Sequence, residues 1–222
     1  VGLILPPRLA PIHVVIVPIY KNDDERARTC EAAQQVAAEL KAQGIAVKLD
    51  DREGIMPGAK YYEWEGKGVP IRIEIGPKDL EKNQVCVVRR FVLESPGDTE
   101  QTLRAKRKAF MPRVEAISKI KPLLDTMQAE LFERALTLKA QRTRVIDTID
   151  EFERFFAQDG GGFAWVHWAG DAEKEDEMAK RFETSIRCIP LAEEIPQEAQ
   201  GAGKCILTGQ PSSQRVIMAK AY

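Results

Sequence analysis

The sequence has little of what membrane proteins and exported proteins need. Its longest apolar run, residues 12–19, is interrupted by His13 and Pro18, whereas a membrane-spanning helix needs about 20 apolar residues. Residues 1–8 have neither an initiator methionine nor a basic flank before their short apolar run, so they do not resemble a signal peptide. We expect a protein without a membrane segment, and a sequence that begins within a longer chain.

Cysteine is sparse and widely scattered. Cys30, Cys86, Cys188 and Cys205 include no pair at the close spacing that presents two thiolates to one metal ion. Isolated cysteines in a chain of this size usually behave as small buried hydrophobic residues in a reducing compartment. The expectation is a cytoplasmic protein without disulfides.

Catalytic motifs are scarce as well. The two histidines, His13 and His167, lie in apolar segments, and there is neither a glycine-rich phosphate loop nor a nucleophile elbow. His167 is more typical of a packed side chain than of a catalytic base. Asp50 and Asp51 are more typical of a helix cap or a turn than of a general acid/base pair. These residues alone indicate a binding module.

What the sequence does have is the composition and patterning of a folded α/β protein. Of 222 residues, 44% are hydrophobic and 30% are charged, enough to bury a core. Apolar spacing predicts a strand at 14–17, a helix from Asp23 to Gly44 and a strand at 45–49, which together favour a parallel β-α-β unit. A helix at 57–67 and strands at 69–75 and 84–88 extend this sheet. Further helices are predicted at 123–138, 149–156 and near 173–184, and further strands at 163–168, 187–190 and 216–219.

Positive charge is concentrated in residues 101–122, which carry seven basic side chains and one acid, Glu115. A basic stretch of this density is an electrostatic footprint for phosphates. The candidate phosphate contacts are Arg104, Lys106, Arg107 and Lys108. The alternative is a solvated helix or loop surface.

Residues 50–82 read DDREGIMPGAKYYEWEGKGVPIRIEIGPKDLEK. The motifs Asp-Asp-Arg at 50–52, Glu-Trp-Glu at 63–65, Arg-Ile-Glu at 72–74 and Gly-Pro-Lys-Asp-Leu-Glu at 76–81 carry a resemblance. This stretch resembles the anticodon-binding domain of the prolyl-tRNA synthetase family, in the form shared by archaea, eukaryotes and some bacteria. The resemblance extends from Leu-Pro-Pro-Arg at 5–8 to Ala-Lys-Ala-Tyr at 219–222, and therefore covers essentially the whole chain.

The resemblance implies the fold and its division into domains. Residues 12–122 would form the anticodon-binding domain of class II synthetases, a mixed β-sheet flanked by helices, and residues 123–222 a small α+β C-terminal domain. Residues 1–11 would be the tail of the catalytic core. The ATP, magnesium and proline sites would lie in that core, so this chain alone is expected to be inactive.

The resemblance also implies function and partners. The chain would recognise the tRNA(Pro) anticodon within a proline–tRNA ligase, which activates proline with ATP and attaches it to tRNA(Pro). Its partners would be tRNA(Pro), its own catalytic domain and a second copy in a homodimer. A second reading stays open: a free-standing module with the same fold that acts in protein interaction or regulation. A class II core upstream of Val1 would decide between them.

By similarity, Glu65, Arg72, Lys78 and Asp79 form the set that reads the anticodon bases. A proline anticodon has guanines at its second and third positions. A carboxylate can accept hydrogen bonds from N1–H and N2–H₂ of guanine, and Arg or Lys can donate to O6 and N7. Without the resemblance, these four residues would be read as a surface salt-bridge cluster.

Two further expectations concern the C-terminal domain. Members of this family carry a structural zinc on four cysteines, but Ala169, Lys174 and Thr208 stand at three of the expected positions and only Cys205 remains. One thiolate cannot close a tetrahedral site, so we expect neither zinc nor another cofactor in this chain. The resemblance also implies that the Tyr222 carboxylate turns toward the aminoacylation site of the complete enzyme; the alternative is local packing of Tyr222.

Overall fold

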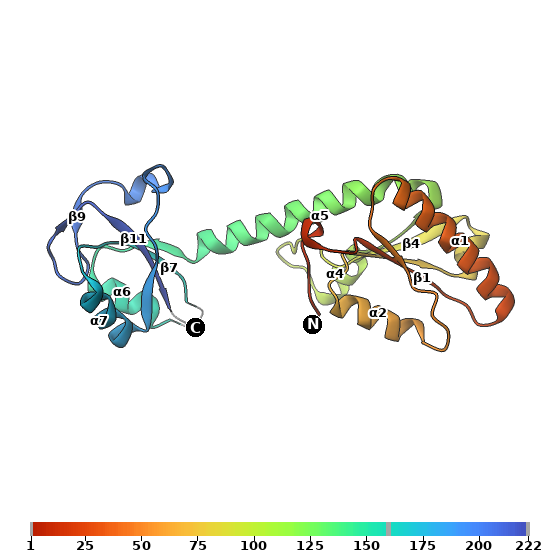
Figure 1. The fold of residues 1–222 in the computed structure, drawn as a ribbon, viewed down its shortest axis with the longest axis horizontal. Coiled ribbons are helices and arrows are strands. Elements are labelled where there is room, and N and C mark those ends of the chain that lie inside the picture. The colour runs from red at the N-terminus through yellow and green to blue at the C-terminus, as the bar shows by residue number, and fades with distance from the viewer. Residues whose placement is uncertain (1, 159–160, 221–222) are drawn as a thin grey trace. The chain divides into compact units, whose positions relative to one another are not determined.

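A computed structural model describes residues 2–158 and 161–220. The chain forms two compact units, Val1–Arg134 and Ala135–Tyr222. Figure 1 shows the helices and strands of both. Among the described residues, no helix is both long enough and apolar enough to cross a membrane.

The first unit is built on a five-stranded mixed sheet. Its strands are β1 (Val14–Pro18), β2 (Val47–Leu49), β3 (Ile71–Ile75), β4 (Gln84–Arg89) and β5 (Lys108–Pro112), in the order β2-β1-β3-β4-β5. β1 pairs in parallel with β2 and β3, which confirms the predicted β-α-β unit. β4 pairs antiparallel with both β3 and β5. The sheet is therefore parallel at one side and antiparallel at the other.

Local sequence signals explain where the helices of this unit begin. They are η1 (Pro7–Leu9), α1 (Asp23–Ala42), α2 (Pro57–Gly66), α3 (Pro77–Glu81), α4 (Glu100–Arg107) and α5 (Arg113–Gln141). Asn22 caps α1 by accepting from the backbone N–H of Glu25, and Thr99 caps α4 in the same way. α2 and α3 each begin at a proline, whose fixed φ suits the first helical position.

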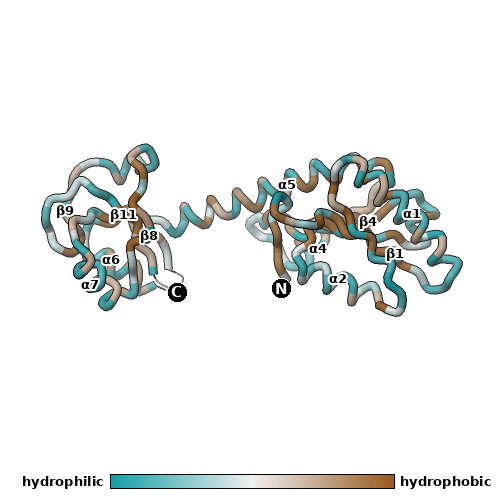
Figure 2. The backbone as a smooth tube through the Cα atoms, viewed as in Figure 1, coloured by the Kyte–Doolittle hydropathy of each residue, from teal (hydrophilic) through white to brown (hydrophobic). Residues whose placement is uncertain are grey.

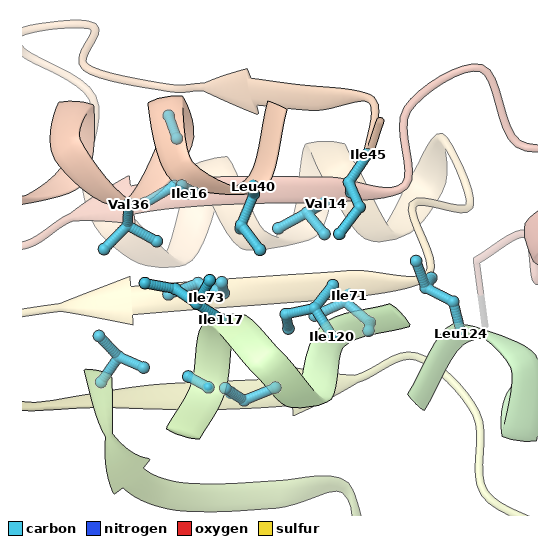
Figure 3. Packing of buried hydrophobic residues seen from close by; sticks show 14 of the residues in the cluster. Val14, Ile16, Val36, Leu40, Ile45, Ile71, Ile73, Ile117, Ile120 and Leu124 are labelled. Carbon is cyan, nitrogen blue, oxygen red and sulfur yellow. The ribbon is translucent and has the colours of Figure 1, made fainter. Parts of the chain in front are cut away.

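The two faces of this sheet differ. On one face, alternate residues such as Ile16 and Ile73 pack against α1 and α5 through Leu40 and Ile120, as Figure 3 shows. On the other face, Val15 and Val17 of β1 pack against Trp64 of α2. The β3–β4–β5 part of this second face carries the charged residues Arg72, Glu74 and Lys108 and the exposed Phe110, and this is where the candidate site lies.

The second unit has its own sheet and core. The strands are β6 (Thr143–Val145), β7 (Phe163–His167), β11 (Arg215–Lys220) and β8 (Thr184–Cys188), in that spatial order. Helices α6 (Ile149–Phe156) and α7 (Ala172–Phe182) contribute Phe152 and Met178 to a core that also contains Val166 and Val216. Short elements complete it: η2 (Ala192–Glu194), η3 (Gln197–Ala199), β9 (Gly203–Lys204) and β10 (Pro211–Ser212). In Figure 2 the hydrophobic colour is concentrated in strands such as β4 and β11.

The structure differs from the sequence expectations at several places. The helix predicted at 123–138 is the end of α5, which begins at Arg113 and continues through Pro122. Leu124 and Met127 belong to the core of the first unit, so the compact units divide after Arg134, later than the domain boundary predicted after residue 122. β5 lies in the basic stretch, for which the sequence predicts no strand, and α3, β6, β9 and β10 are also not predicted. The strand predicted at 187–190 lies at Thr184–Cys188.

Candidate RNA-binding surface

The candidate site lies on the same face of the sheet as α2, over β3, β4 and β5, and two residues of α2 border it. Arg72 and Glu74 of β3 point to this side, because their neighbours Ile71, Ile73 and Ile75 point into the core. Cross-strand pairing places Val88 between Arg72 and Lys108, and Cys86 between Glu74 and Phe110. We call the surface formed by Arg72, Glu74, Cys86, Val88, Lys108 and Phe110 the open face.

Arg72 is held from three directions. Its Nη1 donates to Glu65 Oε1 at 2.7 Å, and its Nε donates to Glu74 Oε1 at 3.0 Å. The guanidinium carbon lies 4.0 Å from the centre of the Tyr61 ring, a cation–π contact. The structure thus brings Glu65, from the last turn of α2, and Arg72 into direct contact. A side chain fixed in this way loses little rotamer freedom when it binds a ligand.

Lys78 and Asp79 lie on α3, directly after β3. Asp79 Oδ2 accepts from the backbone N–H of Gly76 at 2.9 Å, and Oδ1 accepts from Gln84 Nε2 at 3.2 Å. Asp79 therefore caps α3 as well as facing the site. Lys78 is exposed. Sequence reasoning gave Asp79 only a base-reading role and missed its capping role. The signal was present, because a proline at the first helical position and an acid three residues after Gly76 are typical of a helix start.

The predicted residues line two adjoining cavities. A cavity of about 420 Å³ is bordered by Glu65 and Arg72, and a second of about 570 Å³ by Lys78 and Asp79. Glu74 and Lys108 border both cavities. The four predicted base-reading residues are therefore on one side of the sheet but in two neighbouring hollows.

Glu74 is the acid shared by the two cavities, and sequence reasoning missed it. Its side chain is 8% exposed and also lies 3.4 Å from Lys108 Nζ. Burial lowers the pKa of Lys108, but the charges and hydrogen bonds of Glu74 and Cys86 together outweigh burial and raise it, so Lys108 stays protonated. Burial and the same carboxylate raise the pKa of the Cys86 thiol to about 12. The alternation of Arg72 and Glu74 with isoleucines was the signal that could have identified Glu74.

Acids already pair with three of the four predicted phosphate contacts. Arg104 pairs with Glu100, Lys106 with Asp98 and Lys108 with Glu74. Arg107 differs, because its Nε is buried without a hydrogen-bond partner among the described residues. Arg104, Arg107 and Lys108 line the first cavity.

Arg90 also lines the first cavity, and the sequence analysis did not select it. Burial lowers the pKa of Arg90, the charges of Arg107 and Arg72 add to this effect, and Glu65 opposes it. Arg90 is therefore close enough to Arg107 and to Arg72 for their positive charges to repel it. A concentration of like charge around a hollow favours binding of an anion.

A buried polar network fixes α2 and, through it, Glu65. Asp50 is 1% exposed and accepts from Trp64 Nε1 at 2.7 Å and from Arg52 Nε at 2.8 Å. Lys60 is 2% exposed, donates to the Asp50 carbonyl at 3.1 Å and lies 3.8 Å from its carboxylate. Burial opposes ionisation of Asp50, but these donors outweigh it and hold its pKa below the usual range. Asp50 is a structural residue, as the sequence analysis favoured.

In the second unit, two of the three positions predicted to have lost zinc ligands, Ala169 and Thr208, lie beside the Cys205 thiol. Burial opposes ionisation of Cys205, but the Thr208 hydroxyl and backbone N–H groups, including that of Ala169, outweigh burial and lower its pKa. Among residues 2–158 and 161–220, no group of three or more His, Cys, Asp or Glu side chains is arranged to hold a metal ion. The expectation about zinc stays a prediction.

His167 is a packed side chain, 3% exposed, and burial lowers its pKa. The four cysteines are free thiols. Cys86 and Cys205 are buried, but Cys188 is exposed, so the expectation that isolated cysteines are buried was wrong for Cys188 because it ends a strand at the surface. Tyr222 lies outside the described residues.

Comparison with known proteins identifies both parts of the chain. A family model for an anticodon-binding domain matches residues 13–121, and a model for the C-terminal part of prolyl-tRNA synthetase matches residues 149–222. The proline–tRNA ligase of Roseiflexus sp. (strain RS-1) is 43% identical over 221 residues, which is 100% of this chain and 42% of that protein. The corresponding ligase of Porphyromonas gingivalis is 39% identical, over 100% of this chain and 41% of that protein.

The chain thus spans about 42% of the length of the relatives that it matches. The two family models follow one another along the sequence, and the relatives match across both of them. The chain belongs to the prolyl-tRNA synthetase family, of which it carries the anticodon-binding domain followed by the C-terminal domain.

Proposed function

We propose that this chain recognises the anticodon of tRNA(Pro) as part of a cytoplasmic proline–tRNA ligase. The observation that carries the proposal is the position of Glu65, Arg72, Lys78 and Asp79, which border two adjoining cavities on the open face. The complete ligase would activate proline with ATP and magnesium in its catalytic core and act as a homodimer. The present residues would supply affinity and specificity for the tRNA.

The chemistry of the first cavity suits guanine. The Glu65 carboxylate can accept from the N1–H and N2–H₂ groups of guanine, whereas Arg72 can donate to the acceptors of a base edge. Arg72 is held by Glu65, Glu74 and Tyr61 before any ligand binds. Preorganisation of this kind lowers the entropic cost of binding.

The second cavity offers the same pair of charges. Lys78 is an exposed cation, and Asp79 has both carboxylate oxygens engaged by Gly76 and Gln84. A carboxylate has about four lone-pair sites, so these two bonds leave capacity for a base N–H. Two cavities, each with an acid and a cation, suit two consecutive guanines.

The cations around the first cavity suit the backbone of the same RNA. Arg90 and Arg107 gather beside Arg72 with their like charges only partly compensated. A bound phosphate would relieve this repulsion, and its contribution would fall as salt rises. We assign phosphate binding primarily to Arg107 and Arg90, with Arg104 and Lys108 bordering the same cavity.

The test is binding of proline-anticodon stem-loops to Glu65→Gln. We expect the loss of a good bidentate contact, about 1–3 kcal/mol, for stem-loops that carry guanine at the position Glu65 reads. Inosine lacks the N2 amino group. Guanine-to-inosine replacement should therefore weaken binding to the unchanged protein and have a smaller effect on Glu65→Gln.

Glu63→Gln is the matched control, because Glu63 lies two residues earlier on α2 and pairs with Lys67 and Arg52 rather than with Arg72. It should bind all stem-loops as the unchanged protein does. Equal weakening of every stem-loop by Glu65→Gln, whatever its anticodon, would show that Glu65 does not read a base.

A further inference from the structure

Phe110 is the large aromatic side chain of the open face, where it lies among charged residues such as Lys78, Asp79 and Lys108. It is 58% exposed, although it lies in the middle of β5. Its neighbour Met111 points to the other side of the strand and packs against the core of the first unit. The fold therefore uses the opposite side of β5 for its core and does not bury Phe110.

The surroundings of Phe110 are those of a ligand site. The ring borders the cavity of about 570 Å³ together with Lys78 and Asp79. Lys108 Nζ lies 5.3 Å from the ring centre, a cation–π contact. Cys86, the cross-strand neighbour of Phe110, is buried, and its raised pKa keeps the thiol neutral. The cavity thus combines an apolar wall with charged groups.

This combination matches the shape and polarity of a nucleobase. A base has flat apolar faces and a polar edge, and proteins that bind unpaired bases stack them on aromatic rings while polar groups contact the edge. In the second cavity, Phe110 offers the ring, and Lys78 and Asp79 offer the edge contacts. An aliphatic ligand would need the ring but not these charges.

We propose that Phe110 is the stacking platform for the base that enters the second cavity, so that a ring on β5 and charges on α3 hold one nucleotide from two sides. This inference rests on the proposed recognition of RNA and adds a residue to it. Lys108 would hold the ring through its cation–π contact and contribute positive charge beside the RNA backbone. The platform favours an unpaired base, since the faces of a base in a duplex are covered by its stacked neighbours and its Watson–Crick edge is occupied by its partner.

The experiment uses stem-loops in which 2-aminopurine replaces one anticodon-loop base at a time. Stacking on an aromatic ring changes the fluorescence of 2-aminopurine, so the unchanged protein should produce a distinctive change at one loop position. Phe110→Leu should abolish that change and weaken binding of the unmodified stem-loop by about 5-fold to 100-fold. Phe110→Trp should retain both the signal and the affinity.

An abasic nucleotide at the same position supplies the second arm of a double-mutant cycle. It should remove most of the difference between Phe110→Leu and the unchanged protein, because the base that stacks is then missing. Phe132→Leu is the matched control, since Phe132 on α5 is 62% exposed. It should bind all stem-loops normally. Far-ultraviolet circular dichroism melts establish that each variant is folded.

The outcomes separate this inference from the function on which it rests. Normal binding by Phe110→Leu together with weakened binding by Glu65→Gln would overturn the platform and leave anticodon recognition intact. Normal binding by both variants would overturn both. Weakening by Phe110→Leu that persists undiminished on the abasic stem-loop would also overturn stacking. Stacking would likewise be overturned if Phe110 contacts another protein and not RNA.

Discussion

Replacement of Asp50 by asparagine tests whether the buried network sets the stability of the first unit. The asparagine side chain would keep an acceptor for Trp64 but would remove the negative charge beside Lys60. Lys60 is 2% exposed, so its ammonium group would stay buried with the backbone carbonyl of residue 50, at 3.1 Å, as its remaining partner. Removal of one partner from a buried ion pair typically lowers the free energy of unfolding by about 3–5 kcal/mol.

The other partners of Asp50 change this magnitude little. Arg52 is 43% exposed and also pairs with Glu63, so water and Glu63 would replace most of what it loses. The hydrogen bond from Trp64 would become a neutral one, which is weaker by about 1 kcal/mol. Lys60 is therefore the residue that determines the expected loss.

The assay is urea unfolding, with hydrogen exchange read by mass spectrometry on peptides from residues 1–134. Asp51→Asn is the matched control, because Asp51 is the next residue, has the same side chain and is exposed; its effect should stay within about 0.5 kcal/mol. The double variant Asp50→Asn/Lys60→Met should recover part of the loss, since removal of both members of a buried pair is often neutral. A loss no larger than that of Asp51→Asn, or strict additivity in the double variant, would refute the reasoning.

The stability of the unchanged protein and that of Asp50→Asn should also respond differently to low pH. The pKa of Asp50 is depressed in the folded chain, whereas an unfolded aspartate titrates near 3.9. The unfolded state therefore takes up protons first as pH falls. The stabilisation is present in full above about pH 5 and is lost as pH falls toward the folded pKa. Below pH 5, the unchanged protein should lose more stability than Asp50→Asn.

Three further predictions concern charge, metal and the C-terminus. Arg107→Gln should weaken binding of all stem-loops similarly and reduce the slope of log affinity against log salt by about 1. Lys106→Gln should reduce this slope less, because the Lys106 ammonium group already pairs with Asp98. Equal slopes for the two variants would contradict the assignment of phosphate binding to Arg107. Protein purified without chelator should contain well under one equivalent of zinc, and chelator should leave its melting temperature unchanged; stoichiometric zinc would mean that residues outside the family pattern bind it. Deletion of Tyr222 from the complete ligase should slow proline activation and leave stem-loop affinity unchanged; normal activation would exclude a role near the active site.

The elements that sequence reasoning located share strong local signals. β1 and β3 follow apolar or alternating patterns, and α1 is preceded by a capping asparagine and opened by three acids. Glu65 and Arg72 come from neighbouring elements, α2 and β3, and the structure places their side chains in direct contact. Local pattern and the family resemblance together were sufficient for these features.

What sequence reasoning missed depends on contacts between distant residues. β5 has no apolar alternation, because Lys108 and Phe110 lie on a face that stays exposed, and its strand structure comes from pairing with β4. α5 continues through Pro122 because residues before the proline, Ile117 and Ile120, and after it, Leu124, all pack into the core of the first unit. The loss of one helical hydrogen bond at a proline, about 3 kcal/mol, is offset by the burial of several such side chains at about 1.5–3 kcal/mol each.

Two of the proposed base-reading residues also depend on contacts that stabilise this domain. Glu65 stands on the last turn of a helix that Asp50 anchors through Lys60 and Trp64. Asp79 caps α3 and borders the second cavity at the same time. Replacement of Asp79 by alanine would therefore disturb both the helix and the base contact, whereas asparagine keeps a capping oxygen and removes the charge. If Asp79 reads a base, Asp79→Asn should lower discrimination against stem-loops that lack guanine at its position while its melting temperature stays close to that of the unchanged protein. A parallel fall of melting temperature and affinity for every RNA would assign Asp79 to capping alone.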